Sequence, residues 1–416
     1  MHIFIMANSP GELVGWVKPA VEKLKEKQKK VIIIVVIPPC QYASGMEREV
    51  VENFPEVDLV VGPSQYLKYL FLGIRPSSFR GVKRGVVVFL GGDPFHAVVL
   101  SKRLGLPAVA YMQKPRWKRY FKKFMVLDQA AREKFMAKRA EENKVFVVGD
   151  LTVDGIKLGM SREEGYSRWG LNSGNFIISI LPGSRPEMVR YMTPFFLRAA
   201  ELIKKELPKT QFLLALSPFV PKEELVSLDE SEVSKVFQGA KIKLKKENEK
   251  WKLITESDLE VLVVEGRQYE ALNISHLIIT IPGTHTLEAA YLGIPMLVTI
   301  PLNKPEAIPL DGLAGLVRGV PLFGSSIKRW IVKWCAKRIK FTAIPNIRAG
   351  REIIPEIRGV IEAEDVAKEA IKLLRDPNGL ARMREELREI AGGKGAADKV
   401  ANIILEVGNA RRGDKL

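Results

Sequence analysis

Residues 279–298 read ITIPGTHTLEAAYLGIPMLV: an apolar run, a polar turn, a short mixed stretch and a second apolar run. This order predicts a buried strand, a helix and a second buried strand. Continuous apolar strands joined through helices are typical of a parallel sheet that is covered on both faces. The polar turn lies just beyond the end of the first strand and contains Gly283, Thr284, His285 and Thr286, with Glu288 one turn into the helix.

The same alternation of apolar strands and amphipathic helices runs along both halves of the 416-residue chain. We therefore predict two doubly wound α/β domains around a cleft: residues 1–160 with a returning C-terminal helix at 395–416, and residues 161–394. A polar, Gly-rich stretch at 151–175 is expected to link them. The predicted strands are 3–7, 31–37, 58–62, 86–90, 108–112, 124–128 and 145–149 in the first half, and 176–181, 212–217, 261–266, 277–282 and 295–300 in the second, with a β-hairpin at 241–256.

The formal net charge is +17, and this excess of Lys and Arg favours anionic partners. Nucleic acid, an anionic membrane surface and phosphorylated substrates all fit, and charge cannot choose among them. No apolar run is long enough to cross a bilayer, and the N-terminal residues lack the pattern of a signal peptide. We therefore expect a cytoplasmic protein. Two cysteines and four histidines, none clustered, predict neither a disulfide framework nor a metal site.

The turn at 283–286 opens a helix, and free N–H groups at a helix start attract anions. One interpretation is a plain polar helix start with Glu288 in solvent. The other is a donor site, with a diphosphate at the helix tip and Glu288 on a sugar hydroxyl.

A second loop, ILPGSRPEM at 180–188, follows another predicted strand and contains Gly183. Ser184 and Glu187 have the spacing of a capping box. That arrangement leaves Arg185 unexplained, because a cation at a helix start opposes the helix dipole. A bound phosphate would remove the conflict, so Arg185 is predicted to contact an anion.

Two loops of the first half carry candidate bases. Glu12 follows the first strand, in MANSPGELVGW at 6–16, and is either a favourable helix-start carboxylate or a functional group. In FLGGDPFHA at 89–97, Asp93 followed by Pro94 fits an N-cap. Asp93 could also accept the proton of an acceptor hydroxyl, with His96 as the competing base.

Two basic stretches carry aromatic residues and could meet a membrane surface or an acceptor. The first, at 113–124, contains Arg116, Trp117, Lys118 and Arg119, and could equally be a solvated loop. The second, at 328–340, has Trp330 and Trp334 at helical spacing, and could equally be an amphipathic helix packed on its domain.

Taken together, these motifs resemble the lipid-A-disaccharide synthase family of GT-B glycosyltransferases. The stretches that carry the resemblance are ANSPGELVG, GGDPFHAVVLSKRLGLPAVAY, FVVGDLTVDG, ILPGSRPEM, PGTHTLEAAYLGIPMLV and IPNIRAGREIIPE. The resemblance implies two Rossmann-like domains, a nucleotide-sugar donor in the C-terminal one and a lipid-linked acceptor at the N-terminal one. It also implies inversion at the anomeric carbon without a metal.

By position, the resemblance implies that Arg185 and the backbone at Gly283 and Thr284 contact the donor phosphates. It also implies that Glu288 binds the ribose. Asn346, Arg351 and Glu356 would complete the donor pocket. Asp93 falls close to the family's candidate base. The sequence departs from the family on the acceptor side, where GELVGW has Trp16 in place of an Asp and the basic KPRWKRY replaces an aromatic, proline-containing loop.

The expected function is a metal-independent inverting glycosyltransferase that needs no cofactor and takes part in lipid glycosylation, such as lipid A biosynthesis. It would move a sugar from a UDP-sugar to a lipid-linked acceptor while bound to the inner face of the plasma membrane. No Asp-x-Asp pair, the usual metal anchor of sugar-nucleotide transferases, occurs in the chain. One alternative is a sugar-nucleotide epimerase of the same fold. Another is a non-catalytic protein that binds membranes or RNA, although recognised RNA-binding patterns are absent.

Overall fold

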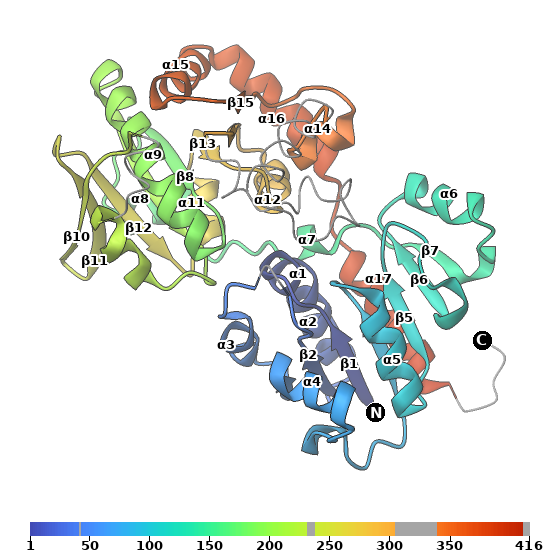
Figure 1. Ribbon diagram of the computed structural model, residues 1–416. Coiled ribbons are helices and arrows are strands. Elements are labelled where there is room, and N and C mark those ends of the chain that lie inside the picture. The colour runs from blue at the N-terminus through green and yellow to red at the C-terminus, as the bar shows by residue number, and fades with distance from the viewer. Residues whose placement is uncertain (41–42, 231–237, 304–338, 411–416) are drawn as a thin grey trace. The chain divides into compact units, whose positions relative to one another are not determined.

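The computed structural model describes residues 1–40, 43–230, 238–303 and 339–410. Contacts divide the chain into unit 1, which is Met1–Ile156 with the segment from Gly392 onward, and unit 2, which is Lys157–Ala391. Each unit contains a largely parallel sheet flanked by helices (Figure 1).

The described part of unit 1 forms a seven-stranded parallel sheet in the order β3-β2-β1-β4-β5-β6-β7. Apart from His2, the residues of its central strands are apolar and buried, as expected for strands covered on both faces. The strands are β1 (His2–Met6), β2 (Ile32–Val36), β3 (Leu59–Val61), β4 (Gly85–Phe89), β5 (Ala108–Tyr111), β6 (Lys123–Val126) and β7 (Val145–Val147). The helices are α1 (Pro10–Glu12), the π-helical turn η1 (Leu13–Val17), α2 (Lys18–Lys27), α3 (Glu47–Glu52), α4 (Pro63–Leu72), α5 (Pro94–Leu104), α6 (Gln129–Ala137) and α7 (Leu151–Asp154).

The C-terminal helix α17 (Ala396–Asn409) packs within unit 1. The carboxylate of Asp154 accepts hydrogen bonds from the backbone N–H groups of Gly395 and Ala397, at 2.7 and 2.5 Å. A carboxylate is stabilising at a helix N-terminus, where the helix dipole is positive. Lys123 forms an ion pair with Glu406 near the other end of the helix. The returning segment is therefore anchored at both ends.

The described part of unit 2 forms an eight-stranded sheet in the order β10-β11-β12-β9-β8-β13-β14-β15. The strands are β8 (Phe176–Leu181), β9 (Thr210–Leu216), β10 (Ile242–Glu247), β11 (Lys250–Thr255), β12 (Glu260–Glu265), β13 (Leu277–Thr280), β14 (Met296–Pro301) and β15 (Glu356–Gly359). The helices are α8 (Arg162–Trp169), α9 (Pro186–Glu206), α11 (Gln268–Asn273), α12 (His285–Leu292), α14 (Ile344–Ala349), α15 (Ala363–Leu374) and α16 (Pro377–Ala391).

The predicted β-hairpin is confirmed as the antiparallel pair β10–β11. Its turn residues Asn248 and Glu249 have φ angles of 47° and 63°. Positive φ at both central residues matches the right-handed twist of a two-residue hairpin.

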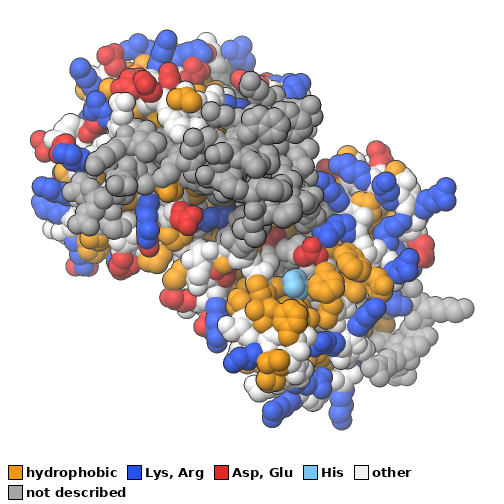
Figure 2. Space-filling view, in the orientation of Figure 1, with side chains coloured by type: hydrophobic (Ala, Val, Ile, Leu, Met, Phe, Trp, Pro, Cys, Tyr) orange, Lys and Arg blue, Asp and Glu red, His pale blue; other side chains and the backbone are white. Residues whose placement is uncertain are grey.

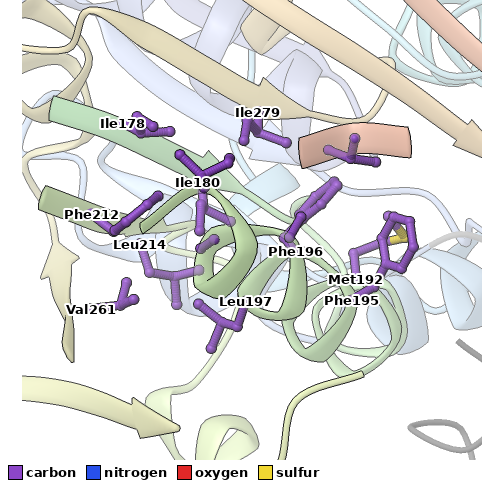
Figure 3. Close-up of a cluster of buried hydrophobic side chains, with 14 of the residues drawn as sticks. Ile178, Ile180, Met192, Phe195, Phe196, Leu197, Phe212, Leu214, Val261 and Ile279 are labelled. Atoms are coloured by element: carbon purple, nitrogen blue, oxygen red, sulfur yellow. The ribbon is translucent and has the colours of Figure 1, made fainter. Parts of the chain in front are cut away.

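The core of unit 2 lies between its sheet and the apolar face of α9 (Figure 3). Phe195 and Phe196 are fully buried there beside the strands, and α15 closes the same cluster. Such a core fixes the long helix, and hence its N-terminal end, against the sheet. Side chains labelled in Figure 3 are Ile178, Ile180, Met192, Phe195, Phe196, Leu197, Phe212, Leu214, Val261 and Ile279.

The predicted linker at 151–175 is corrected by the structure. It contains α7 in unit 1 and α8 in unit 2, and the division between units falls after Ile156. Helix α8 begins with a capping box between Ser161 and Glu164. This spacing indicates a helix start, although the polar composition of the segment suggests a linker. Trp330 and Trp334 of the predicted basic helix at 325–340 lie outside the described residues.

Candidate functional site

In each unit the order of strands reverses beside the first strand. The chain passes from β1 to β2 and β3 on one side, and β4 lies on the other side of β1. In unit 2 it passes from β8 to β9 on one side, and β13 lies on the other side of β8. Ligands of doubly wound sheets bind beyond the carboxyl ends of the strands at such a reversal. The four loops singled out in the sequence follow β1, β4, β8 and β13, so each unit has two of them at its reversal.

Glu12 joins the two loops of unit 1. Its Oε2 accepts hydrogen bonds from the backbone N–H groups of Asn8 and Ser9, at 3.2 and 3.1 Å, and its Oε1 accepts one from Gly92 at 2.9 Å. Burial raises the pKa of the carboxyl group, although these hydrogen bonds favour its ionised form. Because both oxygens hold backbone groups in place, we assign Glu12 to positioning the loops. Its role as a candidate base stays a prediction.

Two glycines make room for that carboxylate. A Cβ on Gly91 would lie 2.1 Å from Cδ of Glu12. Gly92 has a φ of +82°, and a Cβ there would lie 2.9 Å from Oδ1 of Asn8. The pair Gly91-Gly92 is therefore required by the close approach of the two loops.

Asp93 is the N-cap of α5, as predicted. Its Oδ1 accepts a hydrogen bond from the N–H of Phe95 at 2.9 Å, and its Oδ2 forms an ion pair with Arg116 at 3.1 Å. The Asp93 side chain is 41% exposed. A carboxylate at this reversal that is reachable from solvent is suited to accept a proton from a bound hydroxyl.

His96 lies one turn into α5 and is half-buried. Its Nδ1 is 3.0 Å from the hydroxyl of Tyr66 on α4. Burial lowers the pKa of His96, with the charge of Asp93 acting in the opposite direction. The imidazole is thus neutral at physiological pH.

The basic loop predicted from 113–124 lies beside Asp93. Arg116 makes the ion pair with Asp93, and Trp117 has a left-handed φ of 53°. The Trp117 ring lies 6.0 Å from the ring of Phe95. Lys118 donates a hydrogen bond to the carbonyl of Lys138, and Arg119 is exposed. One cluster therefore contains Asp93, His96, Arg116 and Trp117.

The two loops at the reversal of unit 2 are also in contact. The hydroxyl of Thr280, at the end of β13, donates a hydrogen bond to the carbonyl of Leu181, at the end of β8, at 3.0 Å. Gly183 has a φ of +123°, and a Cβ there would lie 3.0 Å from the Ile281 side chain. Glycine is the residue that adopts this backbone at no steric cost.

His285 is half-buried, and its ring turns back onto its own loop. Its Nε2 lies 2.7 Å from the Thr280 hydroxyl and 2.9 Å from the carbonyl of Ile281. Because a carbonyl only accepts, Nε2 carries the ring proton. The ring fills the space beside Gly283, where a Cβ would lie 2.6 Å from its Cε1. Burial lowers the pKa of His285 to about 4. We assign it to holding the loop, and its contact with the donor stays a prediction.

Helices α9 and α12 begin at this reversal without a side-chain hydrogen bond at either N-cap. The N-caps are Arg185 and Thr284, so the capping box predicted for Ser184 and Glu187 is not formed. Thr286 is buried, and its hydroxyl donates to the carbonyl of Gly283 at 2.7 Å, so it too shapes the turn. Two helix starts that lack side-chain caps, next to a guanidinium, are suited to bind a phosphate group.

Glu288 is 8% exposed, which rules out the interpretation of a solvated side chain. It lies in the first turn of α12, below the uncapped helix start. A role on a sugar hydroxyl remains a prediction.

Asn346 and Glu356 form a buried network. Oδ1 of Asn346 accepts from the N–H groups of Ile353 and Ile354, and its Nδ2 donates to the Ile354 carbonyl and to Glu356. This uses the full capacity of the amide, which is 0% exposed. Asn346 therefore shapes the loop, and its contact with the donor stays a prediction.

Glu356 accepts hydrogen bonds from the backbone N–H groups of Thr342 and Ala343, and also pairs with Arg358. Burial disfavours its ionised form, but hydrogen bonds from the Thr342 hydroxyl, from Asn346 and from the two backbone N–H groups outweigh burial and lower the pKa of Glu356. We assign Glu356 to the same internal network. Arg351 is exposed and pairs with Glu386 of α16 at 3.0 Å.

Two residues at these sites were not predicted from the sequence. Thr280 is the last residue of an apolar strand, and Tyr66 is one aromatic residue in a predicted helix. A threonine that ends a strand at a polar turn is a weak signal that could have identified Thr280. The partner of Tyr66 is 30 residues away and follows from the packing of α4 against α5.

Neither a membrane-spanning helix nor a metal-binding group is found in the part of the chain that the structure describes. No helix there is both long enough and apolar enough to cross a bilayer. Nor do three or more His, Cys, Asp or Glu side chains gather there as metal ligands would.

Two Rossmann-like units, each with paired loops at a strand reversal, define the GT-B class of fold. Solved structures with this fold include a putative UDP-N-acetylglucosamine 2-epimerase from Listeria monocytogenes, with a TM-score of 0.57 and 14% identity over 100% of this chain and 99% of that one. UDP-GlcNAc 2-epimerase from Neisseria meningitidis, bound to UDP-GlcNAc, has a TM-score of 0.52 and 16% identity over 98% and 99%. At these identities the likeness concerns the fold alone, and it confirms the predicted fold class.

A family model described as lipid-A-disaccharide synthetase matches residues 139–306, which include β8, β13 and both loops of the unit 2 reversal. The lipid-A-disaccharide synthase of Geobacter metallireducens is 29% identical over 64% of this chain and 58% of its own length. The lipid-A-disaccharide synthase of Methylobacillus flagellatus is 23% identical over 93% of this chain and 93% of its own length. These matches confirm the resemblance of this chain to lipid-A-disaccharide synthases. The segment aligned with the Geobacter protein spans less than two thirds of that relative.

Proposed function

We propose that the chain is a metal-independent inverting glycosyltransferase that moves a sugar from a UDP-sugar to a lipid-linked acceptor at a membrane surface. The observation that carries the proposal is the reversal in unit 2. There two uncapped helix starts and Arg185 lie beyond adjacent strands, within the segment that matches the family. Backbone N–H groups and a guanidinium stabilise the negative charge that develops on a leaving diphosphate.

The acceptor site of this proposal is the cluster around Asp93 in unit 1. The acceptor hydroxyl gives its proton to the Asp93 carboxylate while its oxygen bonds to the anomeric carbon. The bond from that carbon to the diphosphate breaks on the opposite face, and its electron pair leaves on UDP. Asp93 is preferred as the base because Glu12 is engaged by three backbone N–H groups.

Exposed apolar side chains on unit 1 support a lipid acceptor. Figure 2 shows hydrophobic side chains gathered on the face of unit 1, with Lys and Arg among them. Phe71 and Leu72, at the end of α4, are 76% and 69% exposed, and Phe95 and Trp117 are 42% and 39% exposed. Exposed apolar groups with cations around them fit the interface of an anionic membrane.

Donor binding is tested by thermal shift with UDP, UDP-glucose and UDP-N-acetylglucosamine. A ligand held at 100 times its dissociation constant stabilises the native state by about 2.7 kcal/mol. We expect Asp93→Asn to keep this shift and to lose turnover. Absence of a shift with every nucleotide would refute the donor assignment, and full turnover in Asp93→Asn would refute the base.

The epimerase alternative is separated by incubating a UDP-sugar with the protein and no acceptor. An epimerase changes the sugar under these conditions, whereas a transferase leaves it unchanged. Chelation with EDTA tests metal independence, since turnover should persist.

Membrane association is tested with vesicles of phosphatidylcholine alone or mixed with phosphatidylglycerol. Binding to the anionic vesicles should weaken with salt, and it should weaken further in Phe71→Ser/Leu72→Ser. Equal binding to single-stranded RNA would favour the non-catalytic RNA-binding alternative.

A further inference from the structure

Tyr66 and His96 form a hydrogen bond that the proposed mechanism does not use. The hydroxyl of Tyr66, on α4, lies 3.0 Å from Nδ1 of His96, on α5. The two rings meet edge to face, with centroids 5.3 Å apart. Tyr66 is 1% exposed, so its hydroxyl is shielded from water.

The direction of this hydrogen bond follows from the surroundings of the hydroxyl. Within the described residues, Nδ1 of His96 is its hydrogen-bonding partner, and no second acceptor is present. If Nδ1 carried a proton and donated it, the buried tyrosine proton would have no acceptor, at a cost of several kcal/mol. Burial also raises the pKa of Tyr66, so the hydroxyl keeps its proton at every physiological pH. Tyr66 is therefore the donor.

We infer that Tyr66 is a positioning residue that fixes His96 in the tautomer protonated at Nε2. The neutral imidazole then presents an N–H donor at the strand reversal and has no lone pair available to accept a proton from a substrate. This inference rests on the proposed function, because it assigns different roles in that reaction to the two candidate bases, His96 and Asp93.

The fixed tautomer of His96 gives two neighbouring side chains, His96 and Asp93, different chemical roles. His96 and Asp93 belong to the same helix turn, and the backbone N–H of His96 donates to the carbonyl of Asp93 at 3.1 Å. With His96 as a donor, the proton of the acceptor hydroxyl goes to Asp93. The Nε2–H group can hold an acceptor oxygen while that transfer occurs.

The tautomer is measured by long-range ¹H–¹⁵N correlation spectra of the ¹⁵N-labelled full chain at pH 8. The chain has four histidines, and the spectrum of His96→Gln assigns the resonances of His96 by their loss. In the wild type we expect the ¹⁵N shift of an unprotonated nitrogen at Nδ1 and of a protonated one at Nε2. A protonated Nδ1 would overturn the inference, and this result needs neither substrate nor turnover.

Tyr66→Phe removes the donor, and both His96 nitrogens should then move toward the averaged shifts of mixed tautomers. Tyr69→Phe is the matched control. It removes a hydroxyl from the same helix, where the ring packs against Phe79 and under Arg103. That variant should keep the wild-type His96 shifts. Unchanged His96 shifts in Tyr66→Phe would also overturn the inference.

Activity gives a separate readout. Gln can supply an N–H donor where His96 has Nε2, so turnover should fall less in His96→Gln than in His96→Ala. Equal loss in the two variants would contradict a donor role. If no nucleotide binds but the tautomer is as expected, the proposed function fails and the positioning role stands.

Discussion

Acid should destabilise unit 2 through one half-buried imidazole, that of His285. Its folded-state pKa is lowered from 6.5 to about 4 because burial disfavours the charged ring. The single ring proton is on Nε2, where the Ile281 carbonyl and the Thr280 hydroxyl surround it. A second proton would go on Nδ1, which packs against Gly283 and has no acceptor among the described residues.

The magnitude follows from the two pKa values. One pKa unit corresponds to about 1.4 kcal/mol, so the fall from 6.5 to about 4 is worth about 3 kcal/mol once the pH is well below 4. The unfolded chain binds the proton first as the pH falls, so stability is present above pH 6.5 and declines toward pH 4. Between pH 7 and pH 5 the expected loss is about 2 kcal/mol.

Urea unfolding at pH 7 and pH 5 tests this expectation in the wild type and in His285→Gln. Glutamine keeps an N–H donor but does not titrate, so the variant should lose about 2 kcal/mol less between the two pH values. It should also be less stable at pH 7, because the amide fills the ring's space poorly. His2→Gln, which alters a less buried histidine of unit 1, serves as the control. A variant with the full pH dependence of the wild type would refute the role of His285.

Three further perturbations test the loops. Gly283→Ala places a Cβ 2.6 Å from the His285 ring, so we expect the free energy of unfolding in urea to fall by about 2 kcal/mol or more. Gly393→Ala, with no atom near the new Cβ, is the control and should be nearly neutral. Glu12→Gln turns an amide N–H₂ toward backbone donors, and should speed hydrogen exchange at Gly92 markedly; wild-type protection would contradict the clamp. Glu356→Gln should lower the free energy of unfolding at pH 7 by about 1–3 kcal/mol. The lowered pKa of Glu356 means that this difference should shrink as the pH falls below 4.5; a constant difference would contradict it.

Local sequence pattern predicted most strands because burial on both faces demands continuous apolar runs. It missed β15, Glu356–Gly359, whose four residues are all partly exposed and which, among the described strands, pairs with β14 alone. Such a short segment has neither an apolar run nor an alternation to detect. Its strand conformation comes from hydrogen bonds to a neighbour, which no local pattern encodes.

The candidate site was predicted less completely, for a related reason. The loops were identifiable because each places glycine and polar residues after a strand. The direction in which each side chain points could not be predicted, because it depends on contacts between residues that are distant in sequence. Thr280 meets Leu181 from 99 residues away, and Gly92 meets Glu12 from 80 residues away. His285 turned inward because Gly283 leaves it space, which spacing alone does not reveal.

At both strand reversals, side chains hold two adjacent loops together, but the side chains that do so differ between the two units. Adjacent parallel strands end together, but their outgoing loops leave on opposite faces of the sheet and have no backbone pairing to hold them. In unit 1 the carboxylate of Glu12 joins the loops, and in unit 2 Thr280 and His285 do so. A side chain used in this way cannot turn to a ligand without releasing a loop. The groups that we propose to react and to bind, Asp93 and Arg185, lie instead at the helix N-caps, where both side chains are partly exposed to solvent.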